Sequence, residues 1–271
     1  MTPCPDMKKE PNLMITPAEF PVPLIILPET DSTNNYLTQL CDEQQSAIRE
    51  FTTIIAERQT AGKGQRGNSW ESEDCRNITF SFVVYPTFVE ARRQFVLSQI
   101  VSLSIKEELD EWTEGISIKW PNDIYWNEKK ICGILIENDL SGHHIGRSIS
   151  GIGVNINQEI FRSNAPNPVS LKQITGQEYD RYLILANIMR RLKEYYILLQ
   201  TDTSGEAVNH ITEHYAHSLF RREGFHRYAD ADGEFLARLL RVEPDGRFIL
   251  EDQAGRERGY LFKKVQYILF P

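Results

Sequence analysis

A glycine-rich stretch between two runs of strand-forming residues is the strongest local constraint on the fold. Residues 57–70 read ERQTAGKGQRGNSW, with three glycines in six positions, and apolar runs at 51–56 and 78–84 flank them. We therefore expect a loop that joins two strands. Glycine lets backbone N–H groups approach an anion closely, and residues 58–70 contain three cations and no acid. The pattern favours anion binding, with an exposed and merely solubilising hairpin loop as the alternative.

This loop matches neither of two common phosphate-binding motifs. No Gly-Lys-Ser/Thr opens a helix after the spaced glycines, so it is not a P-loop, and it is not GxGxxG at the start of a helix.

The charge of the whole chain contrasts with that of the loop. The 271 residues have a formal net charge of -8, which argues against a general nucleic-acid or anionic-membrane surface. The four cysteines show neither CxxC nor zinc spacing, which favours reduced thiols in the cytoplasm. The apolar run at 24–27 is too short to span a membrane, and the N-terminus lacks the pattern of a targeting signal. We expect a cytoplasmic protein without a nucleic-acid or membrane partner.

Hydrophobic periodicity predicts an α+β protein with three parts. Residues 1–22 are proline-rich and aperiodic, so we expect an irregular lead-in too short for a helix-turn-helix. Residues 23–217 alternate strand-like and helical patterns and form the predicted main domain. Residues 218–271 have short alternating runs at 235–242, 247–251 and 260–263 and turns at Asp-Gly and Ala-Gly, which indicates a small SH3-like barrel. The main-domain strands are expected at 24–27, 51–56, 78–84, 116–120, 124–126, 131–137 and 145–154, and its helices at about 34–48, 89–112, 180–199 and 204–217.

Two further patterns have simple structural explanations beside functional ones. His210, His214 and His217 fall at i, i+4 and i+7 on one helix, where three imidazoles could face a metal, but a solvated helix face is favoured because spacing is the only support. Cys132 lies in an apolar strand and is expected to be a core residue rather than a nucleophile.

Polar clusters follow the predicted strands at four places, and their order is specific. The clusters are DSTN at 31–34, the glycine-rich loop, KWPND at 119–123 and GIGVN at 151–155, and Lys130 opens KICGILIE. The motifs ETDSTN, AERQTAGKGQRGNSW, KWPNDIYWNEKKICGILIE and GIGVNIN, in this order, closely resemble those of the biotin–protein ligase family. The resemblance implies a mixed sheet flanked by helices, the class II synthetase-like catalytic domain of biotin and lipoate ligases, followed by an SH3-like C-terminal domain.

The resemblance also implies roles for individual residues. The expected biotin-binding residues are Ser32, Thr33, Asn34, Gln59, Lys63, Gly64, Gln65, Lys130 and Gly133. The expected ATP-binding residues are Trp70, Lys119, Asn122, Asn155 and Lys130. The expected catalytic residues are Lys130, Asp123, Lys63 and Arg66, and no metal ligand is certain.

Ser32 and Asp123 have structural roles as alternatives, and the loop departs from the usual family pattern at Lys63 and Gln65. Ser32 has a helix cap as its alternative or additional role, and Asp123 has an Asx turn after the proline. The commonest bacterial loop has Arg at the positions of Lys63 and Gln65. Because glutamine cannot neutralise an anion, the charge must come from Lys63, Arg66 or both.

The activity implied by the resemblance has two steps. Biotin and ATP give biotinyl-5′-AMP and pyrophosphate, with Mg²⁺ expected, and biotin then passes to a lysine of the biotin carboxyl carrier domain of a carboxylase. A lipoate–protein ligase of the same fold is the nearest alternative, and KWPND with the spacing to Lys130 favours biotin. The short N-terminus and the net charge disfavour a ligase that is also a DNA-binding repressor, so a monofunctional ligase is expected.

A binding module without catalysis is the third alternative. The set Lys63, Lys119, Asp123 and Lys130 argues against it. We expect a monomer or a homodimer, because a sheet edge can pair with either the acceptor or a second copy.

Overall fold

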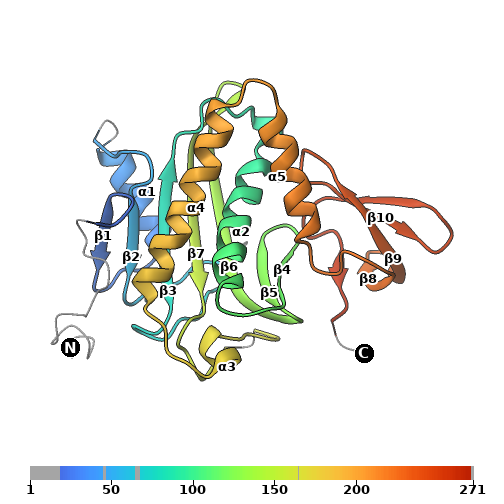
Figure 1. Ribbon diagram of the computed structural model, residues 1–271, viewed down its shortest axis with the longest axis horizontal. Coiled ribbons are helices and arrows are strands. Elements are labelled where there is room, and N and C mark those ends of the chain that lie inside the picture. Colours follow the sequence, from blue (N-terminus) through green and yellow to red (C-terminus); the bar gives the residue numbers. More distant parts are fainter. Residues whose placement is uncertain (1–18, 45–46, 65–67, 164, 270–271) are drawn as a thin grey trace.

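The structure is a computed structural model that describes residues 19–44, 47–64, 68–163 and 165–269. Within these residues it contains a seven-stranded sheet, in the order β1-β2-β3-β7-β6-β5-β4, and a five-stranded sheet, in the order β11-β10-β9-β8-β12 (Figure 1). The strands of the larger sheet are β1 (Leu24–Leu27), β2 (Thr53–Ala56), β3 (Ile78–Val84), β4 (Ile116–Lys119), β5 (Asp123–Trp126), β6 (Lys129–Ser141) and β7 (His144–Val154). Those of the smaller sheet are β8 (His226–Asp230), β9 (Gly233–Val242), β10 (Phe248–Asp252), β11 (Glu257–Tyr260) and β12 (Gln266–Tyr267).

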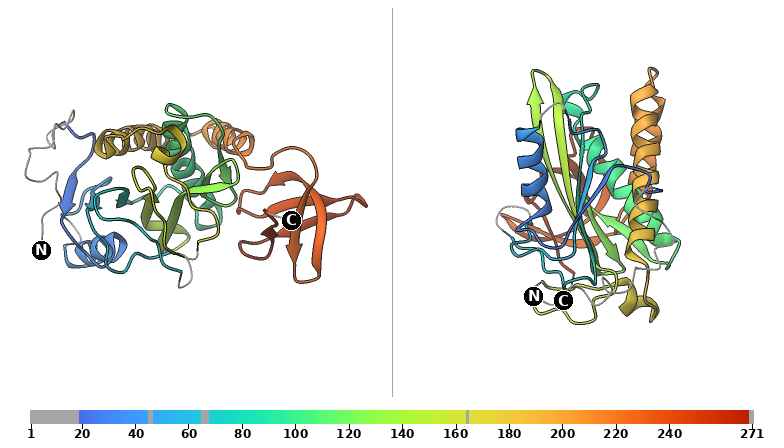
Figure 2. Two further views of the ribbon diagram at one scale, coloured as in Figure 1. Left: turned by 90° about the horizontal axis from the view of Figure 1, so that it is seen from below. Right: turned by 90° about the vertical axis from the view of Figure 1, so that its left-hand side faces the viewer.

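Helices cover both faces of the larger sheet. The helices are α1 (Thr33–Glu43), α2 (Phe95–Asp110), α3 (Leu171–Thr175), α4 (Arg181–Thr201), α5 (Glu206–His217) and the 3-10 turn η3 (Ala91–Arg93). Figure 2 shows α1 on one face of the sheet and α2 and α4 on the other. Every residue of β3 is buried, as expected for a strand covered on both faces. Two hydrophobic clusters result, a large one under α2, α4 and α5 and a smaller one under α1.

The larger sheet is mixed, as predicted. β1 pairs with β2 in parallel, and each other neighbouring pair among its described strands is antiparallel. The register places Gly133 of β6 beside Gly153 of β7, and Gly151 of β7 beside Ser81 of β3. These glycines leave part of the sheet surface without side chains, next to the N-terminus of α1.

The smaller sheet is bound to the larger domain through the segment between β4 and β5. The indole Nε1 of Trp120 donates to the carbonyl of Gly246 at 2.9 Å. Its ring stacks on Phe248 with a centroid distance of 4.8 Å. The predicted fold class, a mixed sheet flanked by helices with a C-terminal SH3-like domain, is confirmed.

Element boundaries differ from the predictions in several places. Helix α1 ends at Glu43, and α2 begins at Phe95 rather than near residue 89. The reason for the late start of α2 is that the backbone of Glu90 and Ala91 pairs with the β6–β7 hairpin. The strand predicted at 260–263 lies at Glu257–Tyr260, directly after the Ala-Gly turn, and β8, β12 and α3 were not predicted.

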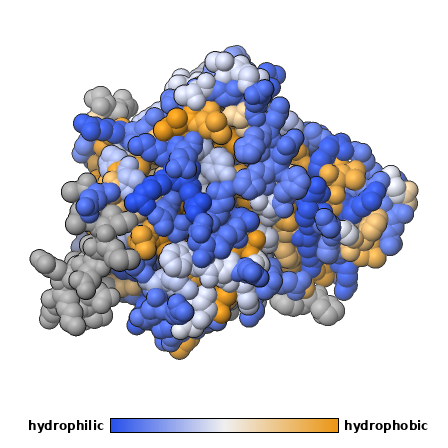
Figure 3. Space-filling view, viewed as in Figure 1, coloured by the Kyte–Doolittle hydropathy of each residue, from blue (hydrophilic) through white to orange (hydrophobic). Residues whose placement is uncertain are grey.

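The cysteines also require a correction. Cys41 and Cys132 are free and buried, as expected for Cys132. Cys75 is disulfide-bonded, so the prediction of reduced thiols throughout the chain is wrong at this residue. None of the described helices is long and apolar enough to cross a membrane, and the face that carries α4 is mainly hydrophilic (Figure 3).

Candidate active site

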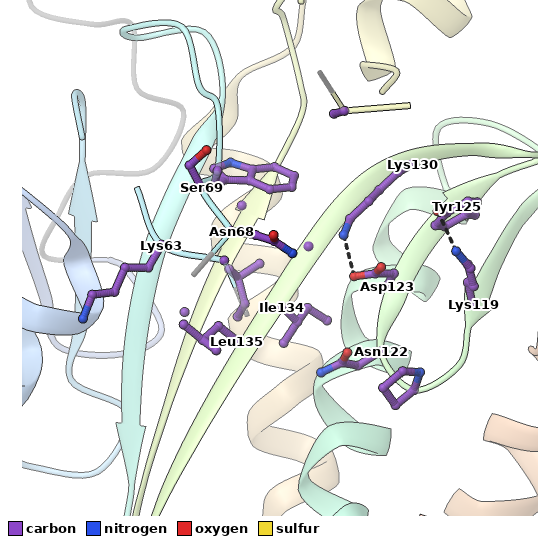
Figure 4. Close-up of a pocket in the computed structure, with 18 of the residues that line it drawn as sticks. Lys63, Asn68, Ser69, Lys119, Asn122, Asp123, Tyr125, Lys130, Ile134 and Leu135 are labelled. Carbon is purple, nitrogen blue, oxygen red and sulfur yellow. Dashed lines mark hydrogen bonds and ion pairs between the residues drawn. The ribbon is translucent and has the colours of Figure 1, made fainter. Parts of the chain in front are cut away.

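One cavity of about 1110 Å³ brings together most of the residues singled out in the sequence. It lies over the glycines of β6 and β7, between the N-terminus of α1 and the smaller sheet (Figure 4). The predicted residues that line it are Ser32, Thr33, Asn34, Gln59, Lys63, Gly64, Trp70, Lys119, Asn122, Asp123, Lys130 and Gly133.

Uncharged polar groups form one end of the cavity, at the start of α1. Ser32 is the N-cap residue of this helix, but its side chain makes no capping hydrogen bond, so the hydroxyl is not used for capping. The backbone N–H of Thr33 donates to Oε1 of Gln59 at 2.9 Å, which ties the helix start to the glycine-rich loop. Ser32, Thr33 and Asn34 are almost fully buried. This end can therefore hold a neutral polar group away from bulk water.

Charged side chains form the other end. Nζ of Lys130 donates to Oδ1 of Asp123 at 2.7 Å, and each side chain is about one third exposed. Figure 4 shows the two side chains facing one another from β6 and β5. Nζ of Lys119 donates to the hydroxyl of Tyr125 at 3.1 Å. Burial is the main cause that lowers the pKa of Lys119; Asp123 opposes the shift, and Lys130 adds to it.

The cavity is positive although the chain is acidic. Among the described lining residues there are four lysines, Lys63, Lys119, Lys130 and Lys263, against one carboxylate, Asp123. A concave surface with such an excess of one sign concentrates ligands of the opposite sign. An anionic ligand is therefore expected at the lysine-rich end.

The indole of Trp70 covers the glycines of the sheet. A Cβ atom added at Gly153 would lie 2.2 Å from the indole, and one at Gly133 would lie 2.8 Å from it. The indole Nε1 is buried and has no hydrogen-bond partner among the described residues. An aromatic ring on this glycine surface offers a face for stacking to a flat ligand.

The glycine-rich loop approaches α1 on its way out of the cavity. Nζ of Lys63 donates to Oδ1 of Asn35, and the backbone N–H of Gly64 donates to the carbonyl of Asn68 at 2.7 Å. Lys63 thus points toward α1 rather than toward Lys130 (Figure 4). The predicted residues Gln65 and Arg66 lie outside the described residues.

Asn155, in contrast, is not part of the cavity lining. It follows β7, is 2% exposed, and donates through Nδ2 to the carbonyl of Val169 at 3.2 Å, while its Oδ1 has no partner among the described atoms. An Asn directly after an apolar run indicates that the residue lies at the end of a strand. It does not indicate on which side of the sheet the side chain lies.

Several lining residues were not predicted. Lys263, Gln266 and Tyr267 reach the cavity from the smaller sheet, and their short alternating runs gave no sign of this. Ser81 and Glu137 lie just outside it and hydrogen-bond to residues that line it. Their signals are a serine inside the apolar run 78–84 and an acid that ends KICGILIE.

The structure offers little for a metal held by protein groups alone. Among the described residues, no group of three or more His, Cys, Asp or Glu side chains could hold a metal ion. His214 instead lies beside Tyr195 and Glu107, at 3.2 and 3.5 Å from its Nδ1.

Comparisons with known proteins relate the chain to one group of ligases. The model of the biotin/lipoate A/B protein ligase family matches residues 26–155. The bifunctional ligase/repressor BirA of Bacillus spizizenii is 28% identical over 218 residues, which cover 78% of this chain and 65% of that protein. The biotin–[acetyl-CoA-carboxylase] ligase of Paracoccus denitrificans is 30% identical over 162 residues, 57% of this chain and 65% of that protein.

The chain thus spans somewhat less than two thirds of the length of these two relatives. Among solved structures, the biotin protein ligase from Aquifex aeolicus in complex with biotin and ATP has a TM-score of 0.72 and 27% identity. That likeness covers 90% of this chain and 99% of the Aquifex chain.

Proposed function

We propose that this chain is a biotin–protein ligase of the biotin/lipoate A/B protein ligase family, whose model matches residues 26–155. It uses ATP to activate biotin as biotinyl-5′-AMP and transfers the biotinyl group to a lysine of a carrier protein. The similar Aquifex enzyme is described in complex with both small molecules, which supports the choice of substrates.

The observation that carries the proposal is the distribution of polar and charged side chains in this cavity. Its uncharged end, with Ser32, Thr33 and Gln59, suits a cyclic urea, whose N–H and C=O groups need compact polar partners. Its lysine-rich end suits a carboxylate and a phosphate. Biotin has a urea at one end and a carboxylate at the other, so a bound molecule directs its carboxylate toward the nucleotide.

In the first step, a biotin carboxylate oxygen attacks the α-phosphorus of ATP, and the bond to pyrophosphate breaks. The two anions repel one another by about 4 kcal/mol per charge pair at 4 Å and an effective dielectric near 20. Lys130 and Lys119 offset this repulsion from the cavity wall. Lys63 and Arg66 add positive charge from the loop, and Trp70 and Asn122 hold the nucleotide from the cavity lining. Asn155 acts from behind the lining, through its bond to the carbonyl of Val169.

In the second step, the acceptor amine attacks the acyl carbon of the adenylate, and AMP leaves with the electron pair of the broken C–O bond. Exposing a neutral lysine amine at pH 7 costs about 4–5 kcal/mol, because its ordinary pKa is near 10.4. Asp123 orients the amine and accepts its proton as the new bond forms. A carboxylate stabilises the ammonium form beforehand, so its role lies in the transition state.

Mg²⁺ belongs to the proposal as the counter-ion of ATP. Magnesium is usually bound by substrate phosphates with one or two protein carboxylates, so a complete protein cage is not required. Asp123 is the carboxylate among the described lining residues. The metal supplies charge neutralisation at the phosphates.

The partner and the setting follow from the same chemistry. The acceptor is the biotin carboxyl carrier protein or domain of a biotin-dependent carboxylase, as the name of the Paracoccus relative suggests. The use of ATP supports a cytoplasmic location. We assign residues 23–217 to catalysis and 218–271 to the SH3-like domain, and we expect no nucleic-acid partner.

The test is the transfer of labelled biotin to a biotin carboxyl carrier domain with ATP and Mg²⁺. We expect transfer by the wild type and a loss of at least about a hundredfold in Lys130→Ala, because a charge aimed at the reacting anions is removed. Lys129→Ala is the matched control, since Lys129 is the adjacent lysine in the sequence, is exposed and does not line the cavity.

Two outcomes would change the proposal. Equal transfer by Lys130→Ala and the wild type would refute the role of Lys130. ATP–pyrophosphate exchange that depends on lipoate and not on biotin would keep the family and move the activity to lipoate ligation.

A further inference from the structure

Two side chains outside the cavity belong to a hydrogen-bonded chain that ends inside it. Nδ2 of Asn34 donates to Oε2 of Glu137 at 2.9 Å. Oγ of Ser81 lies 2.6 Å from Oδ1 of Asn34 and 2.7 Å from Oγ1 of Thr33. Oγ1 of Thr33 lies 3.2 Å from Oε1 of Gln59. Neither Ser81 nor Glu137 lines the cavity, whereas the other three residues do.

The carboxylate of Glu137 determines which group donates and which accepts in each of these hydrogen bonds. A carboxylate only accepts hydrogen bonds, so the amide nitrogen of Asn34 must face Glu137 and its oxygen must face Ser81. Ser81 has a single proton, and at 2.6 Å it is given to that oxygen. The hydroxyl of Thr33 then donates to Ser81.

The remaining contact is the weakest one. Oγ1 of Thr33 and Oε1 of Gln59 are 3.2 Å apart, the longest distance in the chain of contacts. Oε1 of Gln59 is already satisfied by the backbone N–H of Thr33 at 2.9 Å. This is the one arrangement of the two hydroxyl protons that places a proton in both short contacts of Ser81, at 2.6 and 2.7 Å.

This direction decides what the polar end offers to a ligand. Gln59 turns its Oε1 toward Thr33, so its Nε2 remains a donor. The hydroxyl proton of Thr33 points toward Ser81, so the lone pairs of its oxygen remain free to accept a hydrogen bond from a ligand. One donor and one acceptor side by side complement the C=O and N–H of a cyclic urea.

The surrounding strands leave space for the inner part of this hydrogen-bonded series and exclude water from it, whereas Glu137 at the outer end is exposed. Ser81 is fully buried and Asn34 is 2% exposed, so their polar atoms depend on one another for hydrogen bonds. A Cβ atom added at Gly151 would lie 2.2 Å from Oδ1 of Asn34. The glycine of β7 therefore makes room for the amide.

We propose that Glu137 is a positioning residue for the urea end of biotin, acting from outside the cavity through Asn34 and Ser81. The inference rests on the proposed ligase function for the identity of the ligand. Without the carboxylate, the amide of Asn34 is free to rotate, and the hydroxyl chain loses its single direction.

The test compares Glu137→Met and Glu137→Gln in ATP–pyrophosphate exchange. We expect KM for biotin to rise about tenfold in Glu137→Met, with KM for ATP within about twofold of the wild type, since the hydrogen bond that holds the buried amide of Asn34 is lost at the biotin end only. Glu137→Gln restores most of the biotin affinity, because its Oε1 still accepts from Asn34. Ser81→Ala, which breaks the chain one step further in, shifts KM in the same selective way.

Asp139→Asn is the matched control, because it removes an exposed carboxylate two residues further along the same strand. Unchanged KM for biotin in Glu137→Met, or an equal rise for both substrates, would overturn the inference. Calorimetric titration of biotin into the same variants separates the two proposals. Biotin binding that depends on Glu137, without any biotin-dependent exchange, would refute the ligase activity and leave the role of Glu137 standing.

Discussion

Single glycines of the sheet determine where the indole of Trp70 lies. In Gly153→Ala, the new Cβ would come within 2.2 Å of the ring and displace it. On the proposed contact of Trp70 with ATP, we expect KM for ATP to rise about tenfold or more, because a well-packed ring loses its position. Pyrophosphate exchange at varied ATP measures this.

The matched control for that substitution is Gly146→Ala at the far end of the same strand. Its Cβ would meet Cβ of Ser141 at 3.1 Å, a contact that a small shift relieves. An unchanged KM for ATP in Gly153→Ala would contradict the role of the glycine surface.

The residues that the sequence predicted best are those inside contiguous motifs. Lys119 and Asp123 are paired on the neighbouring strands β4 and β5, and Lys130 follows on β6, the next antiparallel strand, so local pairing alone brings them together. Ser81 and Glu137 were missed because their partner Asn34 lies 47 and 103 residues away in the chain. Such contacts depend on strand order, which local periodicity does not encode.

At the level of elements, the turn between β10 and β11 has the clearest dependence on pH. Oδ1 of Asp252 accepts from the backbone N–H groups of Ala254 and Arg256 at 2.9 and 3.1 Å. The bond from Arg256 is the largest cause that lowers the pKa of Asp252 to about 2, and Arg258 contributes further. Because the folded form has the lower pKa, the stabilisation is complete above pH 4 and is lost as the pH falls toward 2.

Asp252→Asn should therefore melt at a lower temperature than the wild type at pH 7, with the difference shrinking between about pH 4 and pH 2. Thermal melts followed by circular dichroism across this range test the expectation. Asp245→Asn, in the exposed turn before β10, is the control. A difference that stays constant from pH 7 to pH 2 would show that charge is not the cause.

Boundaries of elements were predictable where the capping signal is local. The helix expected from residue 180 has its cap there, because the side chain of Asp180 accepts from the backbone N–H groups of Tyr182 and Leu183. The short helix α3 has an equally local signal, the capping box of Ser170 and Gln173, which was overlooked in a polar segment. The late start of α2 was not predictable, because a hairpin some fifty residues further along the chain holds Glu90 and Ala91.

For the whole molecule, Trp120 joins the two sheets. Replacing it with leucine removes the stacking on Phe248 and the hydrogen bond to Gly246. We expect Trp120→Leu to lower the free energy of unfolding by about 3 kcal/mol, since a 5% exposed aromatic side chain is truncated at a packed junction. Urea denaturation measures the loss.

Trp126→Leu is the comparison for that experiment, because its indole is only half-buried and bonds to the carbonyl of Glu114 within the larger domain. Equal losses in the two variants would argue against a special role for the junction. The position of the smaller domain was not predictable from the sequence, since its contacts with KWPND join residues more than 120 positions apart.

The pair formed by Lys130 and Asp123 has a consequence for the order of events. Before any ligand binds, each side chain neutralises the other at 2.7 Å. On the proposed function, the carboxylate of biotin competes with Asp123 for Lys130. When the ammonium of Lys130 turns to biotin, its bond to Asp123 is broken. The residue that receives the acceptor lysine is thus freed by the event that prepares the acyl group. Activation would then precede binding of the acceptor lysine without a separate signal, because Asp123 cannot pair with Lys130 and with the acceptor amine at the same time.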